Sequence, residues 1–377
     1  IEFFTPRMGG STQVVYQIAR HLCSWKHEVT VWSSDFASGS AAFPDVPFQT
    51  VLFPSVLTCW GFYFTPALIS WAKRYLGEFD VIHLHNARTF QNLVVSAFAR
   101  RRSVPYLLSA HGSLPIIVQR KPAKRAYDLL FGRRLLAGAS RLIAVSPVEV
   151  EQYIQAGVAQ DRITLVPNGL DLEEFSCLPS RGRLRSKLGI SGEAKVVLFL
   201  GRLHRIKGIN YLLEAFAQLQ ATLDRSVLII VGPDDGELAR LQALAGRLRL
   251  NGQVLFIGPL YGEDKLAAYV DADVLASPAA YEIFGLVPFE ALMCGTPVIV
   301  SDNCGSGQLI REARAGYLAP YGNVTALTNA LLRVFTNREE ARQKVSAGQI
   351  FVREQLDWRI VAGKVENLYR EVVQTSR

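Results

Sequence analysis

Two carboxylates, Glu282 and Glu290, flank an apolar turn in the stretch YEIFGLVPFEAL at residues 281–292. Proline is favoured at the first position of a helix, so Pro288 predicts a helix start with Val287 as its cap. Glu290 then lies in the first helical turn, where the positive end of the helix dipole stabilises a carboxylate. Taken alone, Glu290 is explained as a structural acid at a helix start.

The backbone between the two acids adds hydrogen-bond donors. A helix start leaves its first N–H groups unpaired, so those of Phe284, Gly285 and Leu286 are expected to point at a ligand. Glu282 precedes this turn, on the loop that follows a predicted strand. One acid on the loop and one in the first turn can bind hydroxyl groups at two ends of a single polyol, while the amides between them face an anionic group.

A second polar loop, LGRLHRIKG at residues 200–208, also follows a predicted strand directly. Arg202 and Lys207 present two cations whose side chains can converge on a diphosphate. The spacing is neither the GxxxxGK[ST] of a Walker loop nor GxGxxG. Surface charge is an adequate explanation for His204 and Arg205, but it explains Arg202 and Lys207 less well because glycines flank them.

Other polar motifs do not combine into a metal site. In the sequence DAD, Asp271 is expected to end a helix and Asp273 to open a strand, so the two do not share a site. His83 and His85 are separated by one residue on a predicted strand, which could suggest a metal, but we interpret His83 as a core residue and His85 as a cleft-facing one. The five cysteines are scattered and include no CxxC pair. The sequence therefore predicts no metal ligand set.

The first half of the chain alternates β-rich and helical runs in the order of parallel βαβ units. Predicted strands are residues 1–5, 28–34, 80–86, 105–111, 141–146 and 162–168. We expect them to form one open, twisted α/β sheet in a first domain of residues 1–175.

The second half repeats this alternation after a Pro-, Gly- and Ser-rich break at residues 176–193. Its predicted strands are residues 195–201, 226–232, 253–258, 274–278 and 297–302. The predicted fold class is therefore α/β, with Rossmann-like domains at 1–175 and 176–357 facing each other across a cleft. Residues 358–377 are predicted to form a helix that crosses back to the first domain.

An uncharged run at residues 50–72 is long enough to suggest a membrane span. It contains Pro54, Gly61 and Pro66 and mixes aromatic residues with Thr and Ser, which argues against a membrane helix. We expect a core helix pair with an exposed apolar patch instead.

The positive charge of the chain, +8 in total, is concentrated in residues 100–141, which hold ten Lys or Arg and one acid, Asp128. No zinc-finger, RRM or KH signature accompanies it, so nucleic acid is not an expected partner. An anionic membrane surface fits because apolar residues interleave with the basic ones. These are Tyr127, Leu129, Leu130, Phe131, Leu135 and Leu136. A solvated helix face explains the segment equally well.

Taken together, these motifs resemble the family 4 retaining glycosyltransferases of the GT-B fold. The similarity covers essentially the whole chain. Its motifs are Gly9-Gly10, DVIHLHN at 80–86, GRLHRIKG at 201–208, VLFIGPL at 254–260 and the E-x7-E element EIFGLVPFE at 282–290. The E-x7-E element with a preceding GRxxxxKG is specific, whereas the glycine pair alone is weak.

The resemblance implies how a nucleotide-diphosphate sugar is held. Arg202 and Lys207 would hold the diphosphate, and Glu290 would hold the ribose hydroxyls. Glu282 would bind hydroxyls of the transferred sugar, together with the backbone of residues 284–286. Two cations and a helix start can stabilise the charge of the departing diphosphate, so neither a metal nor a cofactor is expected.

The resemblance also implies roles in the first domain. Gly10 would let the backbone approach the phosphate or the acceptor, and His111 resembles the family histidine that reaches the sugar near its reacting carbon. The usual account of the family is front-face attack with retention, in which the leaving phosphate helps to deprotonate the acceptor hydroxyl. The chain departs from the family at Ala279 or Ala280, where many relatives carry Ser, and at VGPDDG, 231–236, so the nucleotide base stays open.

We therefore expect a retaining, metal-independent hexosyltransferase with a UDP- or GDP-linked hexose as donor. Its acceptor would be a lipid-linked sugar, a glycan or a polysaccharide, and it would be cytoplasmic and peripheral on the inner face of the membrane. One alternative is a hydrolysing nucleotide-sugar epimerase, although the first-domain loops offer few acid–base carboxylates. Another is a non-catalytic sugar-nucleotide sensor or scaffold, against which the intact set of polar residues argues.

Overall fold

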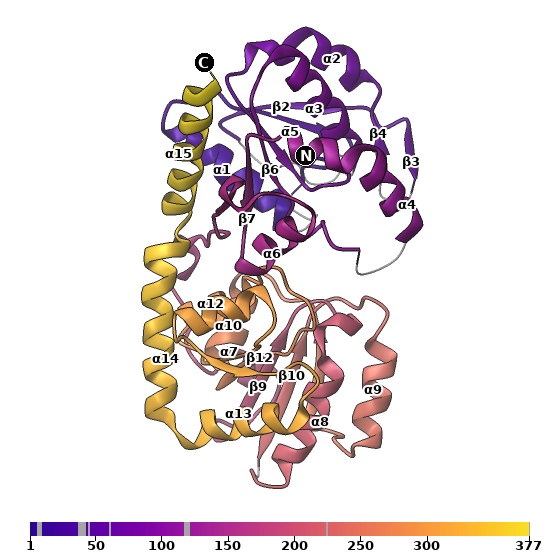
Figure 1. Ribbon diagram of the computed structural model, residues 1–377. Coiled ribbons are helices and arrows are strands. Elements are labelled where there is room, and N and C mark those ends of the chain that lie inside the picture. Colours follow the sequence, from indigo (N-terminus) through magenta and orange to yellow (C-terminus); the bar gives the residue numbers. More distant parts are fainter. Residues whose placement is uncertain are drawn as a thin grey trace. The chain divides into compact units, whose positions relative to one another are not determined.

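The computed structural model describes residues 1–5, 10–36, 43, 46–59, 62–116, 121–223 and 225–376. The chain divides into two compact units (Figure 1). Unit 1 comprises Ile1–Gly169 and Trp358–Arg377, and unit 2 comprises Leu170–Asp357. The border between the two units, after Gly169, lies earlier than the predicted border after residue 175. The short helical turn η4 (Leu172–Phe175) belongs to unit 2.

Unit 1 contains eight described strands. They are β1 (Thr30–Ser34), β2 (Gln49–Phe53), β3 (Leu57–Cys59), β4 (Phe62–Phe64), β5 (Ile82–His85), β6 (Tyr106–Ser109), β7 (Arg141–Ala144) and β8 (Ile163–Leu165). Its described α-helices are α1 (Gly10–Ser24), α2 (Ala67–Tyr75), α3 (Phe90–Arg102), α4 (Lys121–Tyr127), α5 (Arg133–Gly138), α6 (Pro147–Gln155) and α15 (Trp358–Ser376).

The strands of unit 1 form a parallel sheet in the order β5-β6-β7-β8, a separate parallel pair β1-β2 and an antiparallel hairpin β3-β4. The expected single sheet is therefore interrupted. Residues 1–5, predicted as its first strand, contribute only one bridge, between Phe3 and Ser34 of β1. Because residues 1–5 do not form a full strand between β1 and β5, they do not join these two strands into one sheet.

The segment 50–72 differs from its prediction. Instead of a helix pair it forms β2, the hairpin β3-β4 and only one helix, α2. β-branched and aromatic residues favour strands here, while Pro54 and Pro66 interrupt a helix. The segment exposes several apolar side chains, which are Leu52, Val56, Leu57, Phe64 and Ile69. None of the helices that the structure describes is both long and apolar enough to cross a membrane.

The C-terminal helix completes the core of unit 1. α15 packs beside α1, and the two helices lie together in Figure 1. Val361 and Val365 of α15 are buried in one cluster with Ile143 of β7. Gly169 lies so close to the Trp358 ring that a Cβ there would be 2.3 Å from the nearest ring atom. Unit 1 is therefore closed by residues from the far end of the sequence.

Unit 2 is a second α/β body. Its strands are β9 (Lys195–Leu200), β10 (Ser226–Val231), β11 (Val254–Gly258), β12 (Val274–Ser277), β13 (Val298–Ser301) and β14 (Tyr317–Ala319). Its α-helices are α7 (Arg183–Lys187), α8 (Ile209–Gln220), α9 (Leu238–Arg247), α10 (Gly262–Asp271), α11 (Val287–Met293), α12 (Gly305–Glu312), α13 (Val324–Thr336) and α14 (Arg338–Phe351).

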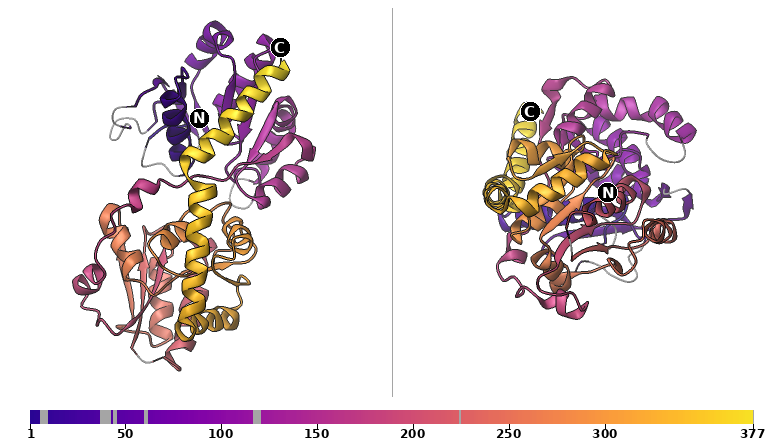
Figure 2. Two further views of the ribbon diagram at one scale, coloured as in Figure 1. Left: turned by 90° about the vertical axis from the view of Figure 1, so that its left-hand side faces the viewer. Right: turned by 90° about the horizontal axis from the view of Figure 1, so that it is seen from below.

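All six strands of unit 2 are parallel, in the order β11-β10-β9-β12-β13-β14. α8 and α9 cover one face of this sheet in Figure 1, whereas α10, α12 and α14 cover the other face. The left-hand view of Figure 2 looks onto that second face. The strand order reverses between β9 and β12, which is the point of such a sheet where ligands bind beyond the carboxyl ends of the strands.

Candidate functional site

The polar loops of unit 2 meet at the point where the strand order reverses. β9 and β12 are neighbours, so the loops that follow them lie side by side. Gly208 has a left-handed φ of +66°, and a Cβ there would be 2.1 Å from the carbonyl oxygen of Pro278. The Ala280 N–H donates to the Ile206 carbonyl at 2.7 Å. These contacts fix the loop that carries Lys207 against the loop that leads to Glu282.

Both cations predicted for a diphosphate have a carboxylate partner. Lys207 Nζ forms an ion pair with Glu282 Oε2, and these side chains are only 17% and 26% exposed. Arg202 Nη1 lies 2.5 Å from Asp235 Oδ2 in a more exposed ion pair. An anionic ligand at this place competes with each carboxylate for its cation. The sequence identified Lys207 and Glu282 separately, but not as partners.

The departure from the family pattern at VGPDDG has a structural explanation. Asp234 Oδ1 accepts the backbone N–H groups of residues 236, 237 and 238 at 2.9–3.0 Å, just where α9 begins. These hydrogen bonds hold the pKa of Asp234 below its usual value. Asp235 instead holds Arg202. One aspartate therefore shapes the loop, while its neighbour sets the position of a candidate ligand-binding cation.

The turn between the two glutamates leaves donors free. Within the described residues, the structure records no acceptor for the backbone N–H groups of Phe284, Gly285 and Leu286. The Phe284 side chain is buried and packs against Phe289, with ring centroids 5.6 Å apart. The apolar ring anchors the turn, so its amides are available to an anionic group.

Gly285 is the position where this turn tolerates no side chain. Its φ is +74°, and a Cβ would lie 2.7 Å from Glu282 Cγ. Gly285→Ala is expected to displace Glu282 and lower kcat/KM by about 10- to 100-fold, because small misplacements of catalytic groups are costly. Gly295→Ala is the matched control, since φ there is +82° and no heavy atom lies within 4 Å of the new Cβ. Equal losses of kcat/KM in the two variants would assign the effect to backbone strain.

Glu290 lies in the first turn of α11, as predicted, but the helix begins at Val287 with Leu286 as its cap. Pro288 is therefore the second helical residue instead of the first. The Glu290 carboxylate is held from α10, where Tyr269 donates to Oε2 at 2.5 Å and Lys265 Nζ lies 3.3 Å from Oε1. Burial first, and the charge of Glu290 second, raise the pKa of Tyr269. Sequence reasoning missed both partners, although their i, i+4 spacing places them on one helix face.

The aspartates of the DAD sequence hold the start of unit 2 together. Asp271 Oδ2 accepts the backbone N–H groups of Leu184 and Arg185 at 2.7 and 2.9 Å. Asp273 Oδ2 lies 2.9 Å from Arg185 Nη2 and accepts the Val196 N–H at 2.8 Å. The Asp271 carboxylate is thus held by backbone amides of α7, and the Asp273 carboxylate by Arg185 of α7 and a backbone amide of β9.

In unit 1, His111 follows β6 in a strained backbone conformation, with φ at +50°. Its Nε2 lies 2.9 Å from His85 Nδ1, and the two rings are parallel. Burial lowers the pKa of His111 to about 4, so the ring is neutral at pH 7. His111 Nδ1 is buried and has no hydrogen-bond partner among the described residues.

The roles predicted for the two strand histidines are corrected. His85 is the buried one, with 5% of its surface exposed, and it contacts His111 instead of an open cleft. His83 is half-buried between Tyr369 Oη at 2.6 Å and Ser109 Oγ at 2.8 Å. Burial and the neighbouring histidines lower the pKa of both rings. Strand β5 therefore places neutral His85 in hydrogen-bond contact with His111.

A buried acid that the sequence did not single out supports the same loop. Glu149 on α6 has no exposed surface, and its two oxygens accept the N–H groups of Gly112 at 2.6 Å and Val145 at 2.8 Å. One helical turn later, Tyr153 Oη accepts the Ala110 N–H at 2.9 Å. The N–H groups of the residues on each side of His111 are thus held by side chains of α6.

Gly10, the remaining predicted site residue, is the first residue of α1 and is exposed. A Cβ there would meet no heavy atom within 4 Å. No contact with the described residues of unit 1 therefore requires glycine at this position. Gly9, its predicted partner, lies outside the described residues.

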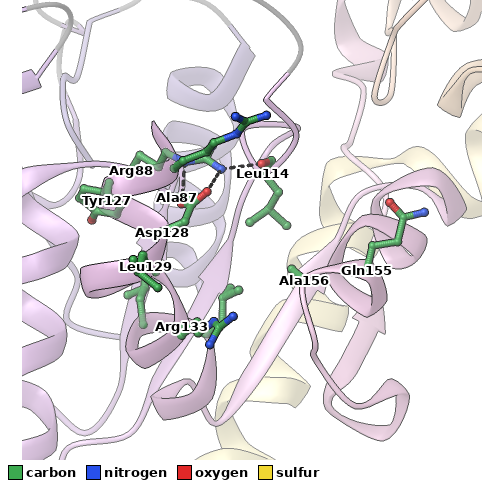
Figure 3. A pocket seen from close by; sticks show the side chains of 13 residues that line it. Ala87, Arg88, Leu114, Tyr127, Asp128, Leu129, Arg133, Gln155 and Ala156 are labelled. Atoms are coloured by element: carbon green, nitrogen blue, oxygen red, sulfur yellow. Dashed lines mark hydrogen bonds and ion pairs between the residues drawn. The ribbon is translucent and has the colours of Figure 1, made fainter. Parts of the chain in front are cut away.

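Unit 1 also contains a groove of about 400 Å³ between the α4-to-α5 helical segment and α6. In Figure 3, Leu129 and Arg133 lie on one wall, and Gln155 and Ala156 lie on the other. The helix between α4 and α5 widens into a π-helical turn, η2, at Asp128–Gly132. Such turns occur frequently at functional sites.

Comparisons with known proteins agree with this arrangement. The family model described as Glycosyl transferases group 1 matches residues 180–350, and that of Glycosyltransferase Family 4 matches residues 8–174. The phosphatidyl-myo-inositol mannosyltransferase of Mycobacterium leprae is 32% identical over 83% of this chain and 79% of its own. The D-inositol 3-phosphate glycosyltransferase of Saccharomonospora viridis is 30% identical, over 80% of this chain and 72% of its own.

Solved structures show the same fold. Sucrose-phosphate synthase from Thermosynechococcus elongatus is similar over 100% of this chain and 96% of its own, with a TM-score of 0.76 and 24% identity. HepE of Anabaena, in complex with UDP, is similar over 98% of this chain and 100% of its own, with a TM-score of 0.78 and 20% identity. The fold is therefore GT-B. Since the two family models together span both units and relatives match most of the chain, this protein belongs to glycosyltransferase family 4 and is a glycosyltransferase.

Proposed function

We propose that this protein transfers a hexose from a UDP- or GDP-linked sugar to an acceptor with retention of configuration and without a metal. The observation that carries the proposal is the convergence of Lys207, Glu282 and the free amides of residues 284–286 at the reversal point of the unit 2 sheet. Cations and backbone donors suit a diphosphate, while a carboxylate suits sugar hydroxyls.

The charges support a dissociative transfer step. As the bond from the sugar to the phosphate breaks, negative charge grows on the departing diphosphate, and Arg202 and Lys207 stabilise it. When Lys207 turns to the diphosphate, Glu282 Oε2 becomes free to accept a sugar hydroxyl. The leaving phosphate oxygen receives the proton of the acceptor hydroxyl, so the protein needs no separate base on that face.

Unit 1 supplies His111 to this reaction. Because the pKa of His111 is lowered to about 4, the ring acts as a neutral hydrogen-bonding group at pH 7. His85 occupies Nε2, and Nδ1 is buried without a partner among the described residues, so Nδ1 can meet a substrate hydroxyl only where it becomes exposed. Gly10, at the start of α1, leaves space for the acceptor or the phosphate.

We propose that the acceptor carries phosphate and is reached at a membrane surface. The names of the two relatives, phosphatidyl-myo-inositol mannosyltransferase and D-inositol 3-phosphate glycosyltransferase, share an inositol acceptor with a phosphate group. The basic and apolar residues of 100–141 suit an anionic lipid surface, and attachment would be peripheral on the cytoplasmic face. Glycans and polysaccharides are the other acceptors to compare.

The decisive test is thermal stabilisation by UDP, GDP, ADP and their hexose conjugates in the presence of EDTA, followed by NMR of the transfer product. One nucleotide series is expected to raise the melting temperature, because a ligand that binds only the folded state stabilises it. The product is expected to keep the anomeric configuration of the donor. A shift that appears only after a divalent metal is added would overturn metal independence, and a free epimerised sugar as product would indicate an epimerase.

A further inference from the structure

We propose that the groove between the α4-to-α5 segment and α6 binds the acceptor lipid itself, with the phosphate at Arg125 and Arg133 and the start of the apolar chain along the leucines. The inference deepens the proposed function and rests on it, because it gives the phosphate-bearing acceptor a place on unit 1. Its volume, about 400 Å³, is within the range of small-molecule sites.

The charges of the groove favour an anion. Among the described residues, the charged ones that line it are three arginines and one aspartate. Asp128 is fully used by Arg88, which contacts Oδ1 through Nε at 2.8 Å and Oδ2 through Nη2 at 2.6 Å. Within the part of the chain that the structure describes, no carboxylate lies within 4.0 Å of Arg125 or Arg133. Each of these guanidinium groups is therefore left for an anion such as phosphate, which its planar donor arrangement matches.

The apolar residues of the groove favour a lipid over a free phosphate. Leu129 is 70% exposed and the adjacent Leu130 is 58% exposed, while Leu135 and Leu136 are buried at the inner end of the groove. Exposed leucines next to unpaired arginines are typical of surfaces that insert into the headgroup region of a membrane. A soluble inositol phosphate would leave this apolar surface in water.

The groove is connected to the loop that carries His111. Arg88 donates through Nη2 to the Leu114 carbonyl at 2.6 Å and through Nη1 to the Ser113 carbonyl. Figure 3 shows Arg88 bridging Asp128 on the helical segment and Leu114 on this loop. A phosphate held at Arg133 would thus lie on the same rigid framework as the residues directly after His111.

Binding of short-chain lipids below their micelle concentration tests the site without any sugar transfer. The probes are dihexanoyl phosphatidylinositol, its deacylated headgroup glycerophosphoinositol, and dihexanoyl phosphatidylcholine, measured by calorimetry on the full chain. Arg125→Ala/Arg133→Ala is the test variant, and Arg101→Ala/Arg102→Ala removes two exposed charges elsewhere in the same basic segment. All four arginines are exposed, so the variants are expected to fold.

The expected result is saturable one-site binding of dihexanoyl phosphatidylinositol that the test variant weakens about tenfold or more, whereas the control variant changes it less than about twofold. Leu129→Ser is expected to weaken the lipid but not the headgroup. Equal losses in both arginine variants would overturn the site, as would headgroup binding as tight as lipid binding. Lipid binding without any stabilisation by a nucleotide would instead contradict the proposed sugar transfer but support the lipid site in the groove.

Discussion

Replacement of Lys207 by alanine is expected to lower kcat/KM for sugar transfer by roughly 100- to 1,000-fold, the usual loss when one group that stabilises transition-state charge is removed. Nucleoside diphosphate affinity should fall as well, because Lys207 is the less exposed of the two candidate cations. The measurement is steady-state kinetics together with calorimetric titration of the nucleotide that stabilises the protein.

Two controls separate this effect from unfolding. Arg205→Ala removes an exposed cation from the same helical turn and is expected to leave kcat/KM unchanged. Lys207→Ala is expected to fold but to melt at a lower temperature, since Glu282 loses the partner of an ion pair whose side chains are only 17% and 26% exposed, so the kinetics are measured well below that temperature. Wild-type turnover in Lys207→Ala, or an equal loss in Arg205→Ala, would contradict the assignment.

Loss of Glu149 is expected to produce the largest change in stability. Glu149→Ala removes the acceptor of two backbone N–H groups inside unit 1, at Gly112 and Val145, and should lower the free energy of unfolding by roughly 3 kcal/mol. Hydrogen exchange of the peptide that contains His111 should accelerate, because the Gly112 N–H would lose its acceptor directly after His111. Unchanged exchange there would show that the loop does not depend on Glu149.

The same residue gives stability a dependence on pH. Burial raises the pKa of Glu149 from its ordinary value of 4.5 to about 7. Between these pH values the folded protein keeps a proton that the unfolded chain has released, so this group's contribution to the free energy of unfolding falls as pH rises. Glu149→Gln cannot titrate. Between pH 4.5 and pH 7 the free energy of unfolding in urea should therefore drop more for the wild type than for the variant, in which Glu2, whose pKa is also raised to about 7, still titrates. Equal drops in the two proteins would contradict the role of Glu149.

The local features of unit 2 could be predicted from the sequence because they depend on neighbouring residues. Strands followed by Gly-rich polar loops indicated where Lys207 and Glu282 leave the sheet, and Pro288 located the start of α11 to within one residue. The pairing of Lys207 with Glu282 joins residues 75 positions apart and depends on β9 and β12 being neighbours. One sequence does not reveal strand order, so the ion pair was missed.

In unit 1, the surroundings of the two β5 histidines likewise depend on residues that are distant in the sequence. Residues two apart on a strand share a face, and the rings of His83 and His85 on β5 lie side by side with centroids 4.0 Å apart, so their division into a core and a cleft residue was wrong. The partner of each ring depends on distant parts of the chain. Tyr369 of α15, 286 residues further along the chain, holds His83, while His111 holds His85. Glu149 gave no signal because an acid near a helix start normally has a purely local explanation.

The division of the chain also sets an order of events during synthesis. Unit 2 runs without interruption from Leu170 to Asp357, and its two ends meet where the Leu170 N–H donates to the Leu356 carbonyl at 2.6 Å. Its whole sequence has been made before the 19 residues of α15, on which the core of unit 1 depends. Domains usually fold in the order in which the ribosome makes them. We therefore expect unit 1, whose larger part precedes unit 2 in the sequence, to complete its packing only after α15 has been made.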